Sequence, residues 1–89
     1  MINQRTYKFT FEIKEKALKS LQALPKHQFK QIGHAMDSLQ QNFSGDIKKL
    51  KGYEDRYRLR VGDVRVLFKL VKTHITVYLI AYRKDAYGN

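Results

Sequence analysis

Apolar and polar residues alternate near the start of the chain and again through its second half. Over residues 7–13, aromatic and aliphatic side chains alternate with Lys, Thr and Glu, which is the period of a strand with one buried face. Similar runs predict three more strands at about 56–61, 64–71 and 75–82. Residues 43–53 follow no such period, and we expect them to form looser structure.

Between the first strand and this loose segment, apolar residues recur at spacings of three and four, as on one face of a helix. The first predicted helix ends at Pro25 and carries Ala17, Leu18, Leu21 and Leu24. The second runs from about Lys26 to Asn42, and its apolar stripe is Phe29, Ile32, Ala35, Met36 and Leu39. Because the link between the two is short, we expect an antiparallel helical hairpin.

The predicted order is one strand, two helices and then a three-stranded antiparallel meander. This order indicates an α+β fold in which the helices pack on one face of the sheet. A chain of 89 residues holds one hydrophobic core, so we expect a single domain over residues 1–89. The side chains that alternation directs toward the helices are Tyr57, Leu59, Val61, Val64, Val66, Phe68 and Leu70.

Three arginines lie on the other face of the predicted meander. Gly62-Asp63 between two alternating runs is typical of a two-residue hairpin turn. This turn pairs Val61 with Val64, and therefore Arg60 with Arg65, while Arg58 lies on the same face two positions earlier. Like charges opposite each other destabilise a sheet. We therefore expect this open face to bind an anion.

The last predicted strand is apolar on both faces, so alternation does not fix its orientation. A three-residue turn would pair Val71 with Ile75 and place Arg83 on the arginine face, near Asp63. A two-residue turn would place Tyr82 and Tyr78 there instead, because a shift of one residue exchanges the two faces.

Composition favours a polyanionic partner. The net charge is +10 and the isoelectric point is near 10, which predicts attraction to RNA, DNA, an anionic membrane or an acidic protein. Basicity that serves only solubility is the alternative. The chain has no cysteine, no signal-peptide pattern and no apolar run of membrane-spanning length. We expect a soluble cytoplasmic protein that does not associate with a membrane.

The chain lacks the sequence patterns of several kinds of functional site. None of the three histidines has metal-ligand spacing, and there is no phosphate-binding glycine motif. We therefore expect no metal site and no cofactor. The loop carboxylates are expected to be solvated or salt-bridged rather than catalytic, and they are Asp46, Glu54, Asp55 and Asp63.

Clustered guanidinium groups with tyrosines nearby suit two activities. Arginines stabilise the negative charge of a phosphoryl-transfer transition state, and RNA supplies its own nucleophile, the 2′-hydroxyl. The same residues suit plain RNA binding, with cations on phosphates and tyrosines stacked on bases. Tyr87, near the end of the chain, fits either a position over a bound base or packing against the sheet edge.

Four blocks of sequence resemble the RelE superfamily of toxin–antitoxin toxins. They are Leu24-Pro25, Lys48-Lys49-Leu50-Lys51-Gly52, the run from Tyr57 to Val66, and Arg83-Lys84-Asp85-Ala86-Tyr87. The resemblance implies a microbial-RNase-like (RelE) fold and a toxin of a type II toxin–antitoxin system. It also implies a metal-free endoribonuclease, an mRNA interferase that cuts translated messenger RNA on the ribosome. The implied partners are an acidic antitoxin and, through their complex, operator DNA.

The resemblance also implies roles for individual residues. The family's catalytic residues correspond to Arg58, Arg60, Arg65, Arg83 and Tyr87. The residues expected to bind RNA are Lys48, Lys49, Lys51, Arg56 and Tyr82. Arg65 is expected to stabilise the transition state.

Two departures from the family pattern leave the general base unassigned. Many members have a histidine where this chain has Tyr82, and some have lysines in place of Arg58 and Arg60. Arginine stays protonated and is a poor base. Tyr87, Tyr82, Lys51 and a group of ribosomal RNA remain candidates for accepting the proton.

The resemblance leaves two other functions open. The first is a ParE-like toxin that inhibits DNA gyrase by binding, although such toxins generally lack the full set of arginines and tyrosine. The second is a degenerate module that binds only its antitoxin and DNA.

Overall fold

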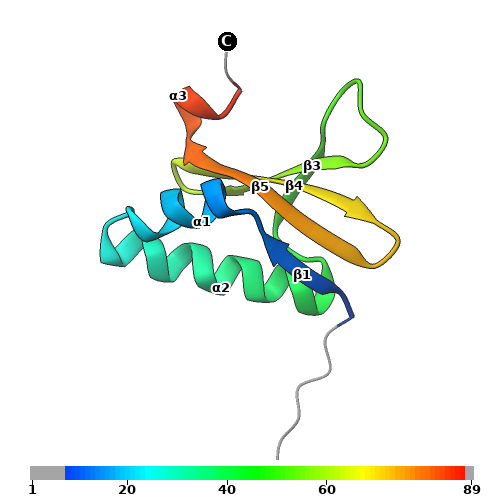
Figure 1. Ribbon diagram of the computed structural model, residues 1–89, viewed down its shortest axis with the longest axis horizontal. Helices are drawn as coiled ribbons and strands as arrows, with labels where there is room; N and C mark the ends of the chain where they lie inside the picture. Colours follow the sequence, from blue (N-terminus) through cyan, green and yellow to red (C-terminus); the bar gives the residue numbers. More distant parts are fainter. Residues whose placement is uncertain (1–7, 88–89) are drawn as a thin grey trace, which may run out of the picture.

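Five strands form one sheet in the order β1-β5-β4-β3-β2, within residues 8–87, which are the residues that the computed structural model describes (Figure 1). The chain passes in turn through β1 (Thr10–Ile13), α1 (Glu15–Gln22), α2 (Lys26–Asn42), β2 (Asp46–Lys49), β3 (Arg56–Val61), β4 (Val64–Val71), β5 (His74–Tyr82) and α3 (Arg83–Ala86). The predicted α+β class is therefore confirmed.

The predicted antiparallel meander is present as β3, β4 and β5, but it forms only the centre of a wider sheet. β1 adds to one edge in parallel with β5, and β2 adds to the other edge antiparallel to β3. The prediction of loose structure over 43–53 was therefore wrong at β2. This strand has four residues with one apolar side chain, Ile47, which is too short a pattern to give a period.

α1 and α2 cover one face of the sheet, and the chain reverses direction between them as the hairpin prediction required (Figure 1). The core between the layers contains Ala17 and Leu21 from α1, and Ile32, Met36 and Leu39 from α2. The sheet contributes Leu59, Val64, Val66, Phe68, Ile75, Val77 and Ile80. Phe29, which belongs to the predicted apolar stripe, is 44% exposed. Helical spacing predicts which way the stripe faces, but it does not predict how far along the helix the sheet covers it.

An aromatic cluster closes the core where α2 ends. Phe43 follows the helix in the left-handed conformation, with φ of 53°. Its ring centroid lies 5.7 Å from that of Tyr57 and 5.9 Å from that of Phe68, both at edge-to-face angles. Edge-to-face pairs of this kind are favourable beyond the apolar area that they bury. They hold the start of β3 against the helical layer.

The sequence left open a two-residue or a three-residue turn before β5, and the structure has features of both. Val71 pairs with His74, so the turn has two residues, Lys72 and Thr73. A β-bulge at Tyr78 then shifts the pairing by one residue, and Val64 pairs with Tyr82. The result at this end of the strand is the register that a three-residue turn would have given. It brings Arg83 beside Asp63, with the Arg83 amide donating to the Asp63 carbonyl at 2.7 Å.

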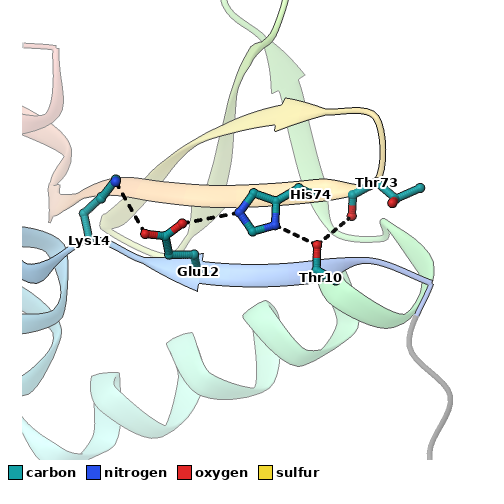
Figure 2. Close-up of polar contacts among 5 residues, drawn as sticks. All are labelled: Thr10, Glu12, Lys14, Thr73 and His74. Atoms are coloured by element: carbon teal, nitrogen blue, oxygen red, sulfur yellow. Dashed lines mark hydrogen bonds and ion pairs between the residues drawn. The ribbon is translucent and has the colours of Figure 1, made fainter.

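A polar network ties the edge strand β1 to the start of β5 (Figure 2). The His74 ring lies between Thr10 and Glu12, with Nδ1 2.6 Å from Thr10 Oγ1 and Nε2 3.3 Å from Glu12 Oε1. Lys14 Nζ lies 3.4 Å from Glu12 Oε2. The hydrogen bond from His74, followed by that from Lys14, lowers the pKa of the Glu12 carboxyl below its ordinary value.

We predict that Glu12 stabilises the fold at neutral pH and stops doing so in acid. A lowered carboxyl pKa contributes stability that is fully present above the ordinary glutamate pKa of about 4.3 and is lost as pH falls through the lowered value. The difference in melting temperature between wild type and Glu12→Gln is therefore expected to shrink as pH falls below about 4. Glu15→Gln, which removes a more exposed carboxylate, is the control. A difference that stays constant into strong acid would contradict this assignment.

Candidate functional site

The face of the sheet opposite α1 and α2 carries a cavity of about 910 Å³, which we call the basic cavity. Apart from Leu50 and Tyr87, every residue that lines it is a lysine or an arginine. The basic residues are Lys48, Lys49, Lys51, Arg58, Arg60, Arg65, Arg83 and Lys84. So many like charges around one hollow produce a strong positive potential, which favours an anionic ligand.

The β3–β4 hairpin brings the central arginines together. Gly62 begins the turn with φ of 60°, a left-handed conformation that glycine adopts without steric cost. The strands then pair Val61 with Val64 and Arg60 with Arg65, so the register predicted from the sequence is confirmed. Arg58 lies two residues before Arg60 and therefore on the same face.

Arg65 is buried, with an exposed fraction of 6%, although the sequence placed it on an open face. Its Nη1 donates hydrogen bonds to the Gly62 carbonyl at 2.8 Å and the Val64 carbonyl at 3.3 Å. Leu67 and Ala86 are also buried, because α3 packs against this face on the opposite side of the sheet from α2 (Figure 1). The guanidinium of Arg65 is therefore fixed by the backbone of its own hairpin while it lines the basic cavity.

Asp46 lies beside Arg58 and Arg60. β2 places Asp46 directly opposite Arg60, and the Asp46 carboxylate is 2.8 Å from Arg60 Nε and 3.8 Å from Arg58 Nη2. The expectation of a salt-bridged Asp46 is confirmed. The Arg58 side chain is 13% exposed, whereas those of Arg60 and Asp46 are about half exposed. One carboxylate thus partly neutralises two guanidinium groups and orients both.

α3 supplies the far wall of the basic cavity. It begins at Arg83, and Arg83, Lys84 and Tyr87 all line the cavity. Lys84 and Tyr87 are three residues apart, a spacing that places side chains on the same side of a helical turn. Tyr87 is 55% exposed and lines the cavity, as its predicted position over a bound base requires.

Two residues predicted to bind RNA do not line the basic cavity. The bulge in β5 turns Tyr82 toward the helical layer, where its hydroxyl donates to Gln28 Oε1 at 2.9 Å. Tyr82 instead lines a neighbouring cavity of about 480 Å³ together with Asp63, Arg83 and Lys84. Arg56 is the first residue of β3, and its guanidinium lies close to the rings of Tyr53 and Tyr78.

The structure therefore brings together every other residue predicted for the site and adds two neighbours. These are Lys84 and Leu50, each adjacent in the sequence to a predicted site residue. The helical spacing of Lys84 and Tyr87 was the signal that would have found Lys84. Asp46 was missed as part of the site because its place opposite Arg60 depends on β2, which the sequence did not predict.

Residues 8–87 contain neither a metal-binding cluster of side chains nor a membrane-spanning helix. No group of three or more histidine, cysteine or acidic side chains within that range is arranged to hold a metal ion. None of the helices that the structure describes is long and apolar enough to cross a membrane.

Comparison with known proteins identifies the family. No protein-family model matches the chain. The chain is, however, 34% identical over 88 residues to the putative toxin RelE1 of Methanocaldococcus jannaschii, a match that covers 92% of this chain and 98% of that protein. It is 33% identical over 75 residues to toxin RelE3 of the same organism, covering 79% and 85%. The chain belongs to the RelE toxin family.

Solved structures of RelE toxins have the same fold. The archaeal RelE–RelB complex from Pyrococcus horikoshii OT3 matches with a TM-score of 0.75 and 28% identity, over 89% of this chain and 99% of that one. The RelB–RelE antitoxin–toxin complex from Methanococcus jannaschii matches with a TM-score of 0.74 and 30% identity, over 85% and 94%. The RelE fold expected from the sequence resemblance is thereby confirmed.

We predict that neutralising Asp46 raises the affinity of this RelE-family chain for a polyanion. Asp46→Asn removes one negative charge beside two guanidinium groups, and a unit charge at 4 Å is worth about 1 kcal/mol in water-like surroundings. Binding of a labelled single-stranded RNA should tighten several-fold, and the free energy of unfolding should fall by less than about 1 kcal/mol because the closer pair, Asp46 with Arg60, is half exposed.

The matched control for Asp46→Asn is Glu15→Gln, which changes the net charge equally but lies on α1, in the layer opposite the basic cavity. Fluorescence anisotropy at one fixed ionic strength measures both variants. An equal gain from both variants would mean that only net charge matters and that Asp46 has no special relation to the cavity.

Proposed function

We propose that this RelE-family toxin is an endoribonuclease that cleaves translated messenger RNA on the ribosome. The 2′-hydroxyl of the RNA attacks the adjacent phosphorus, the bond from phosphorus to the 5′-oxygen breaks, and a 2′,3′-cyclic phosphate remains. The observation that carries the proposal is the convergence of Arg58, Arg60, Arg65 and Arg83 on one cavity that Tyr87 also lines.

The arginines act on charge rather than on protons. The attack on phosphorus concentrates negative charge on the non-bridging oxygens, and guanidinium groups stabilise it by paired hydrogen bonds. Arg65 is the best-positioned of the four, because carbonyl groups of its own hairpin hold one side of its guanidinium before any ligand arrives. A donor that is already fixed loses little entropy when the transition state forms.

Proton transfer completes the reaction. The 2′-hydroxyl loses a proton as it attacks, and the 5′-oxygen gains one as it leaves. Of the residues considered as proton acceptors, Lys51 and Tyr87 line the basic cavity. Tyr82 is a poorer candidate for proton transfer, because its hydroxyl donates to Gln28 on the other side of the sheet. A group of the ribosome is the remaining candidate.

The partners of the chain follow from its charge and from its relatives. Solved relatives are described as complexes of RelE with the antitoxin RelB. By analogy, we propose that an acidic antitoxin neutralises this toxin and that their complex binds operator DNA. A protein of net charge +10 is suited to rapid, electrostatically steered association with such a partner and with ribosomal RNA in the cytoplasm.

Expression of the toxin without an antitoxin is expected to stop translation before DNA synthesis. Incorporation of labelled amino acids and of thymidine after induction distinguishes the two, and primer extension on a translated message locates the cuts. Arrest of thymidine incorporation while translation continues would instead support the gyrase-inhibiting, ParE-like alternative. Normal growth after induction would instead support the module that binds only its antitoxin and DNA.

Arg65→Ala is expected to reduce ribosome-dependent cleavage by about two to three orders of magnitude, the usual loss for one well-placed donor to a transition state. Ribosome binding should fall much less, because the other basic residues of the cavity remain. Single-turnover cleavage and co-sedimentation with ribosomes measure the two effects separately. The control Lys69→Ala removes a cation on the same sheet face but outside the cavity. Parallel losses of binding and cleavage in Arg65→Ala would make Arg65 a binding residue only.

A further inference from the structure

The Arg56 guanidinium lies close to two tyrosine rings on the cavity side of the sheet, outside the basic cavity. We propose that Tyr53, Arg56 and Tyr78 form a stacking site for one nucleobase of single-stranded RNA, which we call the stacking site. The proposal rests on the proposed function to the extent that RNA reaches the basic cavity beside it.

One guanidinium lies within cation–π distance of both aromatic rings. Arg56 Cζ lies 4.7 Å from the centroid of the Tyr53 ring and 5.0 Å from that of the Tyr78 ring. Both distances are within the range of cation–π attraction. Tyr78 lies on this face because the two-residue turn pairs Thr76 with Lys69, and Tyr78 follows Thr76 by two residues, before the bulge changes the register.

One ring of the stacking site is available to a ligand. Tyr53 is 51% exposed, whereas Arg56 and Tyr78 are half-buried. The loop that carries Tyr53 projects beyond the sheet on the side where α3 lies (Figure 1). It is held by a turn in which the Tyr53 amide donates to the Leu50 carbonyl at 3.4 Å and Gly52 adopts φ of 87°. Tyr53 is thus a half-exposed aromatic ring with a guanidinium close to it.

The position of the stacking site fits an RNA strand that continues out of the basic cavity. Arg56, Arg58 and Arg60 occupy alternate positions of β3 and so share one face. Leu50 and Lys51 line the basic cavity, and Tyr53 follows two residues later. A strand whose phosphate lies at Arg58 would therefore present a neighbouring base to Tyr53. Aromatic rings and arginine planes are the surfaces on which proteins stack unpaired bases of RNA.

Binding to short RNA tests the stacking site directly. The probe is an unstructured RNA oligonucleotide with 2-aminopurine placed at each position in turn, because the fluorescence of this base is quenched when it stacks. Tyr53→Leu is expected to remove the quenching at one position and to weaken RNA binding by about 5- to 150-fold, the range for one stacked base. Tyr53→Phe keeps the ring and should match wild type.

Inorganic polyphosphate is the control ligand, since it carries charge without bases. Its affinity should be the same for wild type and Tyr53→Leu, and an equal loss on both ligands would overturn the proposal. Arg56→Lys keeps the charge but removes the planar group, so it should also lose quenching. This variant keeps the test decisive if Tyr53→Leu has a lowered melting temperature. Quenching that survives in both variants would likewise refute the stacking site.

The base has two possible sources, which cleavage on ribosomes separates. A base of the message predicts that Tyr53→Leu changes the sequence preference of the cuts. A base of ribosomal RNA predicts weaker ribosome binding with the pattern of cuts unchanged. If Tyr53→Leu changes neither the sequence preference of the cuts, nor ribosome binding, nor RNA binding, the stacking site is refuted while the nuclease proposal is not. If the wild-type protein quenches 2-aminopurine but cleaves no RNA, the nuclease proposal is refuted while the stacking site is supported.

Discussion

The antiparallel pairing of β3 with β4 determines where the charges of the site lie. Once Gly62 turns the chain, every residue of β3 has a fixed partner on β4, and Arg60 must face Arg65. The same pairing directs Leu59, Val64 and Val66 into the core. A shift of one residue would exchange the two faces and bury the arginines among apolar side chains. The hydrophobic core and the cation cluster therefore enforce a single register.

Concentrating cations has an energetic cost, and the structure shows how it is reduced. Arg65 has little contact with water, which is unfavourable for a charge unless polar groups replace that water. The carbonyls of Gly62 and Val64 do so without neutralising it. Asp46 partly neutralises Arg58 and Arg60 but is itself half exposed, so an anionic ligand can compete with it. The site is thus stable when empty and still strongly positive.

Local irregularities place the outer parts of the site. The bulge in β5 brings Arg83 beside Asp63 and turns Tyr82 toward α2, whereas Tyr78 lies near Arg56 through the register that the Lys72-Thr73 turn sets. One extra residue in one strand thus determines which side chains at the end of β5 face the basic cavity. Bulges often lie next to functional sites because they redirect side chains without disrupting the rest of a sheet.

Alternation and helical spacing in the sequence were enough to predict the α+β class, the two core helices, the three-stranded meander and the pairing of Arg60 with Arg65. These features depend on neighbours in the chain and on a turn defined by Gly62, so local pattern contains them. Tertiary structure alone decided the parallel contact of β1 with β5, the presence of β2, the bulge at Tyr78, and the burial of Arg65. β1 and β5 are distant in sequence, β2 has too few apolar residues to show a period, and β5 is apolar on both faces, so alternation does not reveal its bulge. Their positions depend on which surfaces remain unpaired after the core has formed, and no local pattern records that.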